Sequence, residues 1–147
     1  DSDASKRIDC LNEDQINSLV EQLFCMEQNM AVITINRRQF DLAKGHSQRC
    51  LAHSRRYGLE GEKKITMIFQ ALEGCCSLQD QQDNHSCSLS FAEECYNLVV
   101  EAYDPVHPQV QEAAGVLIGI LISKGDLFDV STYVECTLVM KYSSNYS

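Results

Sequence analysis

A chain of 147 residues fits one domain with a sizeable core, and 44% hydrophobic and 22% charged residues are ordinary globular values. The seven glycines and two prolines are too few for a loop-rich fold. The longest apolar run, residues 113–122, is about half of what a membrane-spanning helix requires, so no membrane association is expected.

The net charge of −9 is unevenly distributed along the chain. Eight Lys and Arg residues lie between Arg37 and Lys64 against three acidic residues, whereas eleven acidic residues lie between Glu73 and Glu135 against Lys124 alone. This bipolar pattern disfavours nucleic-acid binding, for which a basic domain is expected. The two segments are either solvated faces of opposite charge, or the basic one receives an acidic partner. The basic face consists of Arg37, Arg38, Lys44, Arg49, Arg55 and Arg56.

Eight cysteines do not form the pattern of a disulfide scaffold. Most of them lie in helix-like patterns among apolar neighbours, where a free thiol acts as a small hydrophobe. We therefore expect a reduced, intracellular protein, and the cytoplasm is the predicted compartment.

The sequence predicts a series of helices in the first half of the chain. Residues 1–12 are polar and are expected to be flexible, and Asn12 or Asp14 can cap a helix that continues to Asn36. A short strand competes over the β-branched residues 32–35, but the long helical patterns on both sides favour a helix. Further helices are predicted over residues 40–57 and 63–78.

The second half begins with the most polar stretch, residues 79–88, which we interpret as an exposed loop. A helix is predicted over residues 89–102, with Ser90 and Glu93 as a capping box. A turn containing both prolines then leads to a helix over residues 110–123, and Gly125 and Asp126 are placed to end it and cap the next one. Residues 142–147 form a predicted tail. The fold class is thus all-α, with six or seven helices.

A short sequence motif recurs in the second helix of each predicted hairpin. It reads Phe40-Asp-Leu-Ala43, then Leu89-Ser-Phe-Ala92, then Leu127-Phe-Asp-Val130, with spacings of 49 and 38 residues between the last positions. The small final residue stands where two helices must approach. The turn Asp104-Pro105-Val106-His107-Pro108-Gln109-Val110 and the inter-helix Gly125 complete the third unit.

With these motifs the chain resembles the tetratricopeptide repeat, in particular the long units of kinesin light chain-type proteins. The resemblance is most specific in the third unit; the first unit has Arg38 where glycine is usual, and the second needs extra residues within 79–88. It implies a right-handed α-solenoid of about three antiparallel helical hairpins over residues 13–141. Each hairpin would bury its apolar face against the next.

Catalytic and metal-binding chemistry find little support in the sequence. Cys75, Cys76, His85 and Cys87 could supply soft ligands, but vicinal cysteines point apart on a helix and the usual zinc spacing is missing. Glu93 and Glu94 are adjacent and point apart in the same way. No nucleophile signature or phosphate-binding loop occurs. We expect no cofactor, no metal and no enzymatic activity.

The resemblance implies a function for the first helix of each unit, which lines a concave groove in tetratricopeptide arrays. The function expected is a scaffold that binds a peptide or helix of a partner protein. The alternative is a self-association module, a homodimer or part of a longer array, that docks through the apolar C-terminal hairpin. The groove positions are Gln28, Val32, Ile35, Asn36, Met67, Gln70, Ser77, Glu112 and Ser123, together with Gly74, Gly115 and Gly119. Two interpretations are open for Val32, Ile35, Gly115 and Gly119. They either face a partner or serve the packing of the helices.

Overall fold

The computed structural model describes residues 11–56, 58, 61–126 and 129–135. Its five long helices are α2 (Glu13–Asn36), α3 (Phe40–Arg56), α4 (Glu62–Gln81), α5 (His85–Ala102) and α6 (Pro108–Lys124). Residues 129–135 are also helical, and none of the described residues belongs to a strand. The all-α prediction is therefore confirmed. Of the predicted flexible segment 1–12, residues 1–10 lie outside the described part of the chain. The predicted tail, residues 142–147, also lies outside it.

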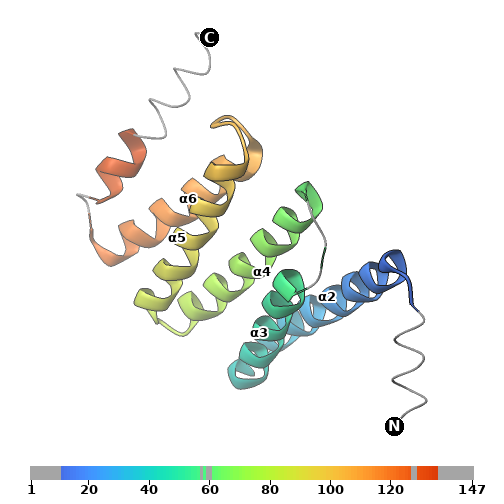
Figure 1. Cartoon of the computed structure of the whole chain (residues 1–147). Helices are drawn as coiled ribbons and strands as arrows, with labels where there is room; N and C mark the ends of the chain where they lie inside the picture. The colour runs from blue at the N-terminus through green and yellow to red at the C-terminus, as the bar shows by residue number, and fades with distance from the viewer. Residues whose placement is uncertain (1–10, 57, 59–60, 127–128, 136–147) are drawn as a thin grey trace.

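The helices follow one another in a row, from α2 at one end to α6 and the short helical segment at the other (Figure 1). Each of the five long helices packs against its neighbours in sequence, and α2 also contacts α4. Connections of only three residues, 37–39 and 82–84, join α2 to α3 and α4 to α5. Such short links force two consecutive helices to run antiparallel as a hairpin.

Helix α2 begins as the sequence predicts, because Asn12 and Gln15 form a reciprocal capping box. It stays helical through the β-branched residues 32–35, so the strand alternative is wrong. The Thr34 hydroxyl donates to the carbonyls of Met30 and Ala31, at 2.7 and 3.0 Å, which satisfies this buried polar group within the helix. Arg38 then turns the chain with φ of 58°, in the left-handed region where glycine is the favoured residue.

The predicted loop over residues 79–88 is wrong. Helix α4 continues to Gln81, and α5 starts at His85 with Asn84 as its cap, which accepts a hydrogen bond from the Cys87 amide. The capping box at Ser90 is therefore wrong too, because Ser90 lies inside α5. The polar composition of this stretch reflects the mostly solvent-exposed ends of two longer helices, and a polar helix end is hard to distinguish from a loop by composition.

The entry to α6 follows the predicted turn. His107 caps the helix by accepting from the Gln109 amide at 3.1 Å, and Pro108 occupies the first helical position. The imidazole of His107 stacks on the ring of Tyr103 with 3.9 Å between ring centroids. Gly125 ends α6 in the left-handed conformation, and Asp126 accepts from the Asp129 amide at 3.2 Å, as predicted.

The core is divided unequally along the row. One cluster of thirteen buried residues joins α4, α5 and α6 around Phe69, Leu72 and Leu117. Two smaller clusters, of five and three buried residues, connect α2 and α3 to α4. The recurring Ala43 and Ala92 are almost completely buried, as expected for positions where helices approach closely. Among the described residues, no helix is both long and apolar enough to span a membrane.

Candidate functional site: a groove along α2, α4 and α6

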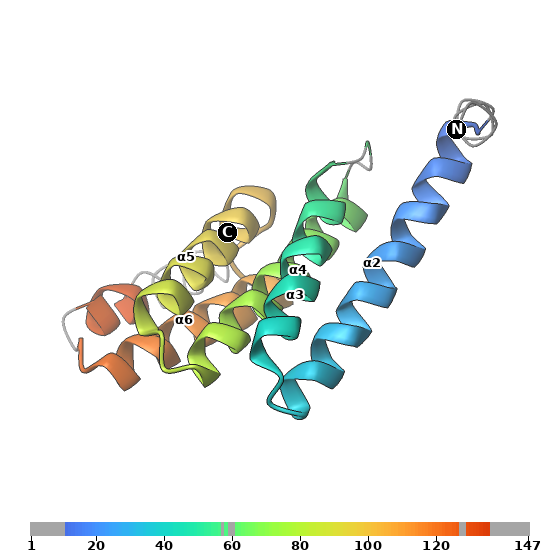
Figure 2. The same ribbon diagram turned by 90° about the horizontal axis from the view of Figure 1, so that it is seen from below.

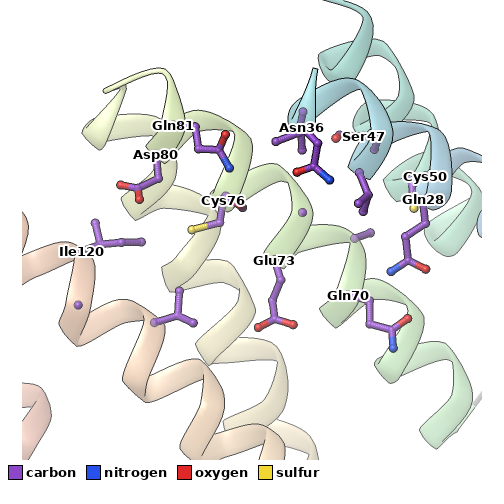
Figure 3. A pocket seen from close by; sticks show the side chains of 18 of the residues that line it. Gln28, Asn36, Ser47, Cys50, Gln70, Glu73, Cys76, Asp80, Gln81 and Ile120 are labelled. Carbon is purple, nitrogen blue, oxygen red and sulfur yellow. The ribbon is translucent and has the colours of Figure 1, made fainter. Parts of the chain in front are cut away.

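A groove of about 670 Å³ runs across the first helix of each pair (Figure 3). It is lined by side chains of α2, α4 and α6 that recur every three to four residues, the spacing of one helical face. Helix α3 contributes Ser47 and Cys50 to the lining. The groove therefore spans the boundary between the small α2–α3 clusters and the large α4–α6 core.

The structure brings seven of the nine predicted groove positions together. The lining includes Gln28, Val32, Ile35, Asn36, Gln70, Ser77 and Ser123, and also Gly74, Gly115 and Gly119. Met67 is not part of this groove, because its side chain is buried in the cluster formed with Phe24 and Cys50. Glu112 lies outside the lining, but its carboxyl group is close enough to Glu73 to raise the pKa of that residue.

The three groove glycines are open to solvent space. A Cβ atom added to Gly74, Gly115 or Gly119 would meet no other atom within 4 Å. Of the two alternatives, packing is therefore wrong for Gly115 and Gly119 within the described part of the chain. Instead they widen the groove, since each removes a side chain from its wall.

The charged residues of the groove are all acidic. Glu73 and Asp80 are its charged lining residues, both from α4. Partial burial, and then the neighbouring Glu112 carboxyl group, raise the pKa of Glu73 to about 7. Figure 3 shows the Glu73 side chain projecting from α4 into the groove, with Gln70 one turn away on the same face.

Ser47 adds an unsatisfied polar atom to the lining. Its side chain is 4% exposed, and its hydroxyl has no hydrogen-bond partner among the described residues. The backbone carbonyl of Ser47, by contrast, accepts from the Cys75 thiol at 3.8 Å. A buried hydroxyl without a partner is destabilising by about 1–3 kcal/mol. A bound molecule that supplied a partner would remove this penalty.

The predicted basic face is partly neutralised by acids of the same chain. Arg49 lies 2.9 Å from Glu27, and Arg55 pairs with Glu94. Arg37, Arg38 and Lys44 are exposed at the α2–α3 end, where the Arg38 guanidinium lies over the Phe40 ring at 5.4 Å; Arg56, also exposed, lies at the other end of α3. The surface that could attract an acidic partner is therefore smaller than the sequence indicates.

Glu27 joins the two helices of the N-terminal hairpin. Its carboxylate oxygens lie 2.6 Å from His46 Nδ1 and 2.9 Å from Arg49 Nε. Partial burial would raise the pKa of Glu27, but the hydrogen bonds to His46 and Arg49 outweigh it, and the pKa is lowered. His46 and Arg49 thus share one face of α3, and both bind Glu27.

The buried cysteines form contacts between neighbouring helices. The thiols of Cys50, Cys75, Cys76 and Cys95 each donate to a backbone carbonyl of an adjacent helix. Burial raises the pKa of each of them, to between about 11 and about 12, so none is an activated nucleophile. Cys75 and Cys76 point to α3 and α5 respectively, and within the described residues no cluster of metal-ligating side chains occurs.

The sequence analysis did not include Glu73 among the groove residues. Glu73 follows Gln70 by three residues and precedes Ser77 by four, so helical spacing alone places it on the same face. Ser47, Asp80 and Val116 were also missed as lining residues. For Ser47 no sequence signal exists, since it belongs to a second helix and reaches the groove only through packing.

The chain was also compared with known proteins. No family model matches it, and no significant match is found among curated proteins or solved structures. The groove and its charges are thus the basis for a functional interpretation.

Proposed function

We propose that the chain is a non-catalytic interaction scaffold of the cytoplasm, which binds a peptide or helix of a partner protein in the groove. In this proposal the helices form a right-handed α-solenoid of tetratricopeptide-like hairpins, with α2, α4 and α6 as the first helices of successive units. The short links within α2–α3 and α4–α5 and the sequential packing of all five helices support this arrangement.

The observation that carries the proposal is the groove itself. Its lining combines small or uncharged polar residues, such as Gly74, Gly119 and Ser77, with apolar groups at Val32 and Ile120. A volume of about 670 Å³ is in the range of ligand-binding sites, here on a surface shared by three helices. Such a surface suits a segment that contributes several side chains in a row, as helices and extended peptides do.

The test fills the groove without disturbing the fold. Changing Gly74→Gln and Gly119→Gln adds side chains where a Cβ meets no atom, and glycine in a helix interior is unfavourable. We expect the free energy of unfolding to rise by roughly 0.5–1 kcal/mol per site, while affinity for peptides selected on the wild-type protein falls at least about tenfold.

A matched control is Ala52→Gln, which places the same side chain on an exposed position of α3 outside the groove. It should leave the affinity unchanged. The proposal is wrong if the glycine variant, shown to be folded by circular dichroism, binds the selected peptides as tightly as the wild type does.

A second candidate function, self-association, is supported by a different surface. Leu19, Leu23, Met26, Met30 and Ile33 are spaced alternately by four and three residues along α2, and they are between 42% and 64% exposed. This is the spacing of a coiled-coil seam, and α2 lies at one edge of the row (Figure 2). We propose a second copy of the chain as the occupant, since two such stripes can pair with each other.

The expected dimerisation surface thus differs from the apolar C-terminal hairpin indicated by the sequence, of which residues 127–128 and 136–147 lie outside the described part. Sedimentation equilibrium tests it: a dimer that becomes monomeric in Leu23→Glu/Met30→Glu supports the α2 stripe. A dimer that persists in this variant, or a wild-type monomer at all concentrations, rules it out.

A further inference from the structure

We infer that the segment bound in the groove carries a Lys or Arg side chain that seats against Glu73 and Glu112, between small and uncharged neighbours. This inference rests on the proposed function and specifies the chemistry of the partner. It differs from the expectation of an acidic partner at the basic face, because the groove has the opposite charge.

The charge of the groove selects a cation. Glu73 and Asp80 are the charged side chains of the lining, and Glu112 contacts Glu73 from α6. Three basic residues of the chain pair with other acids: Arg49 with Glu27, Arg55 with Glu94, and Lys63 with Glu21. Within the described residues, Glu73 has no ion pair with a basic side chain.

The two carboxyl groups lie close together in the free protein. Two carboxylates in contact repel when both are ionised, and a half-buried site screens this repulsion less than bulk water does. Partial burial raises the pKa of Glu73, and the Glu112 carboxylate raises it further. A guanidinium or ammonium group placed between the two carboxylates turns the repulsion into two charge-assisted hydrogen bonds.

The space beside the carboxyl pair fits a long side chain. Gly74 follows Glu73 on α4, and Gly115 lies one turn beyond Glu112 on α6, each with no atom within 4 Å of an added Cβ. The methylene stem of Lys or Arg can lie along these glycines and Val116, with its charged head at the carboxylates.

Ser47 is an independent indication that a ligand completes the groove. Its hydroxyl is buried at the lining without a partner, a condition found at few positions in native proteins. Among the groove residues it is the unsatisfied side-chain oxygen, and because this atom has almost no exposed surface, the groove wall must shift for a polar atom of the bound segment to reach it.

The experiment is a selection from a display library of random 12-residue peptides on the full chain, followed by affinity measurement of the selected peptides. We expect Lys or Arg to be enriched at one fixed position. Affinity should fall about tenfold or more in Glu73→Gln/Glu112→Gln, because the variant removes both carboxylates with which the basic side chain pairs. The control Glu93→Gln/Glu101→Gln removes the same charge from exposed positions of α5 and should bind like the wild type.

The outcomes separate this inference from the proposed function. Peptides that lack a basic residue, or that bind the Glu73→Gln/Glu112→Gln variant equally well, overturn the inference; the groove proposal stands if their affinity is still lost in Gly74→Gln/Gly119→Gln. If no selected peptide depends on these glycines, both the inference and the groove proposal are wrong.

Discussion

The two ends of the row of helices are stabilised in different ways. The α4–α6 region shares one continuous core of thirteen buried residues, whereas the α2–α3 hairpin depends on clusters of five and three that both need α4. Large apolar side chains stay exposed along α2, while the charged contacts of Glu27 join α2 to α3. Because burial of apolar area is the main stabilising term, the N-terminal hairpin should be the less stable part.

This difference bears on the groove, which has walls from both regions. Helices α4 and α6 provide a wall fixed by the large core, and α2 provides a wall attached through the smaller clusters. Binding sites often combine a rigid element with one of lower local stability. We therefore expect α2 to be the helix that adjusts when a segment binds.

The largest expected effect comes from truncating one aromatic side chain in each region. Phe69→Ala removes a ring that is 1% exposed at the centre of the large core, and we expect a loss of about 4 kcal/mol in the free energy of unfolding. Phe24→Ala, in the cluster of five, should cost about 2–3 kcal/mol, because fewer surrounding groups lose contacts. Denaturant unfolding measures both, and equal losses would contradict the unequal division of the core.

Thiol labelling compares local opening in the two regions without mutation. Cys50 lies in the small cluster and Cys95 in the large one, and both are buried with a raised pKa. We expect Cys50 to be alkylated about tenfold faster in the native state, which corresponds to roughly 1.4 kcal/mol in opening free energy. Mass spectrometry resolves each site, with exposed Cys25 and Cys87 as fast references. Identical rates for Cys50 and Cys95 would mean that the chain opens only as one unit.

The ionisation of Glu73 should add a pH dependence to the α4–α6 region. Its pKa of about 7 lies above the ordinary value of 4.5, so the folded state binds a proton more tightly, and stability falls as pH rises from about 4.5 to about 7. Glu73→Gln removes this penalty. We expect it to stabilise the protein by on the order of 1 kcal/mol at pH 8, after allowance for solvent screening, and to have little effect at pH 4.

Unfolding curves of wild type and Glu73→Gln at both pH values provide the measurement, with Glu93→Gln as the control for loss of one exposed charge. A stabilisation of the same size at pH 4 and pH 8 would assign the effect to helix propensity or packing. Neither the burial of Glu73 nor the neighbouring Glu112 carboxylate would then destabilise the ionised form of Glu73.

The sequence predicted the helices well where local signals determine them. The Asn12 cap, the His107-Pro108 entry and the Gly125 end of α6 depend on neighbouring residues, and they were confirmed. The loop over residues 79–88 failed because its polar residues occupy exposed helix ends, and exposure is a property of the packed structure. Arg38 in a left-handed turn shows that a hairpin link can form without the usual glycine.

The groove was predictable only in part. The resemblance to tetratricopeptide repeats predicted many lining positions of α2, α4 and α6, and these share a face because positions three and four apart do so in any helix. It could not identify Met67 as buried, since burial depends on how α2 and α3 lie against α4. The contact between Glu73 and Glu112 joins residues 39 positions apart, and no local pattern encodes such a pair.

The smallest expected effect concerns the charged contacts of the N-terminal hairpin. Glu27→Gln breaks the pairs with His46 and Arg49, and since these groups are partly solvated we expect a loss of about 0.5 kcal/mol that shrinks at high salt. The pKa of Glu27 is lowered, so this contribution is present above pH 4.5 and disappears as pH falls through the folded-state pKa. Unfolding at two salt concentrations measures it. If Glu27→Gln instead costs as much as Phe24→Ala, the charge pairs rather than the small apolar clusters stabilise the hairpin. The stability of the groove wall formed by α2 would then depend on salt concentration more than on truncation of its core side chains.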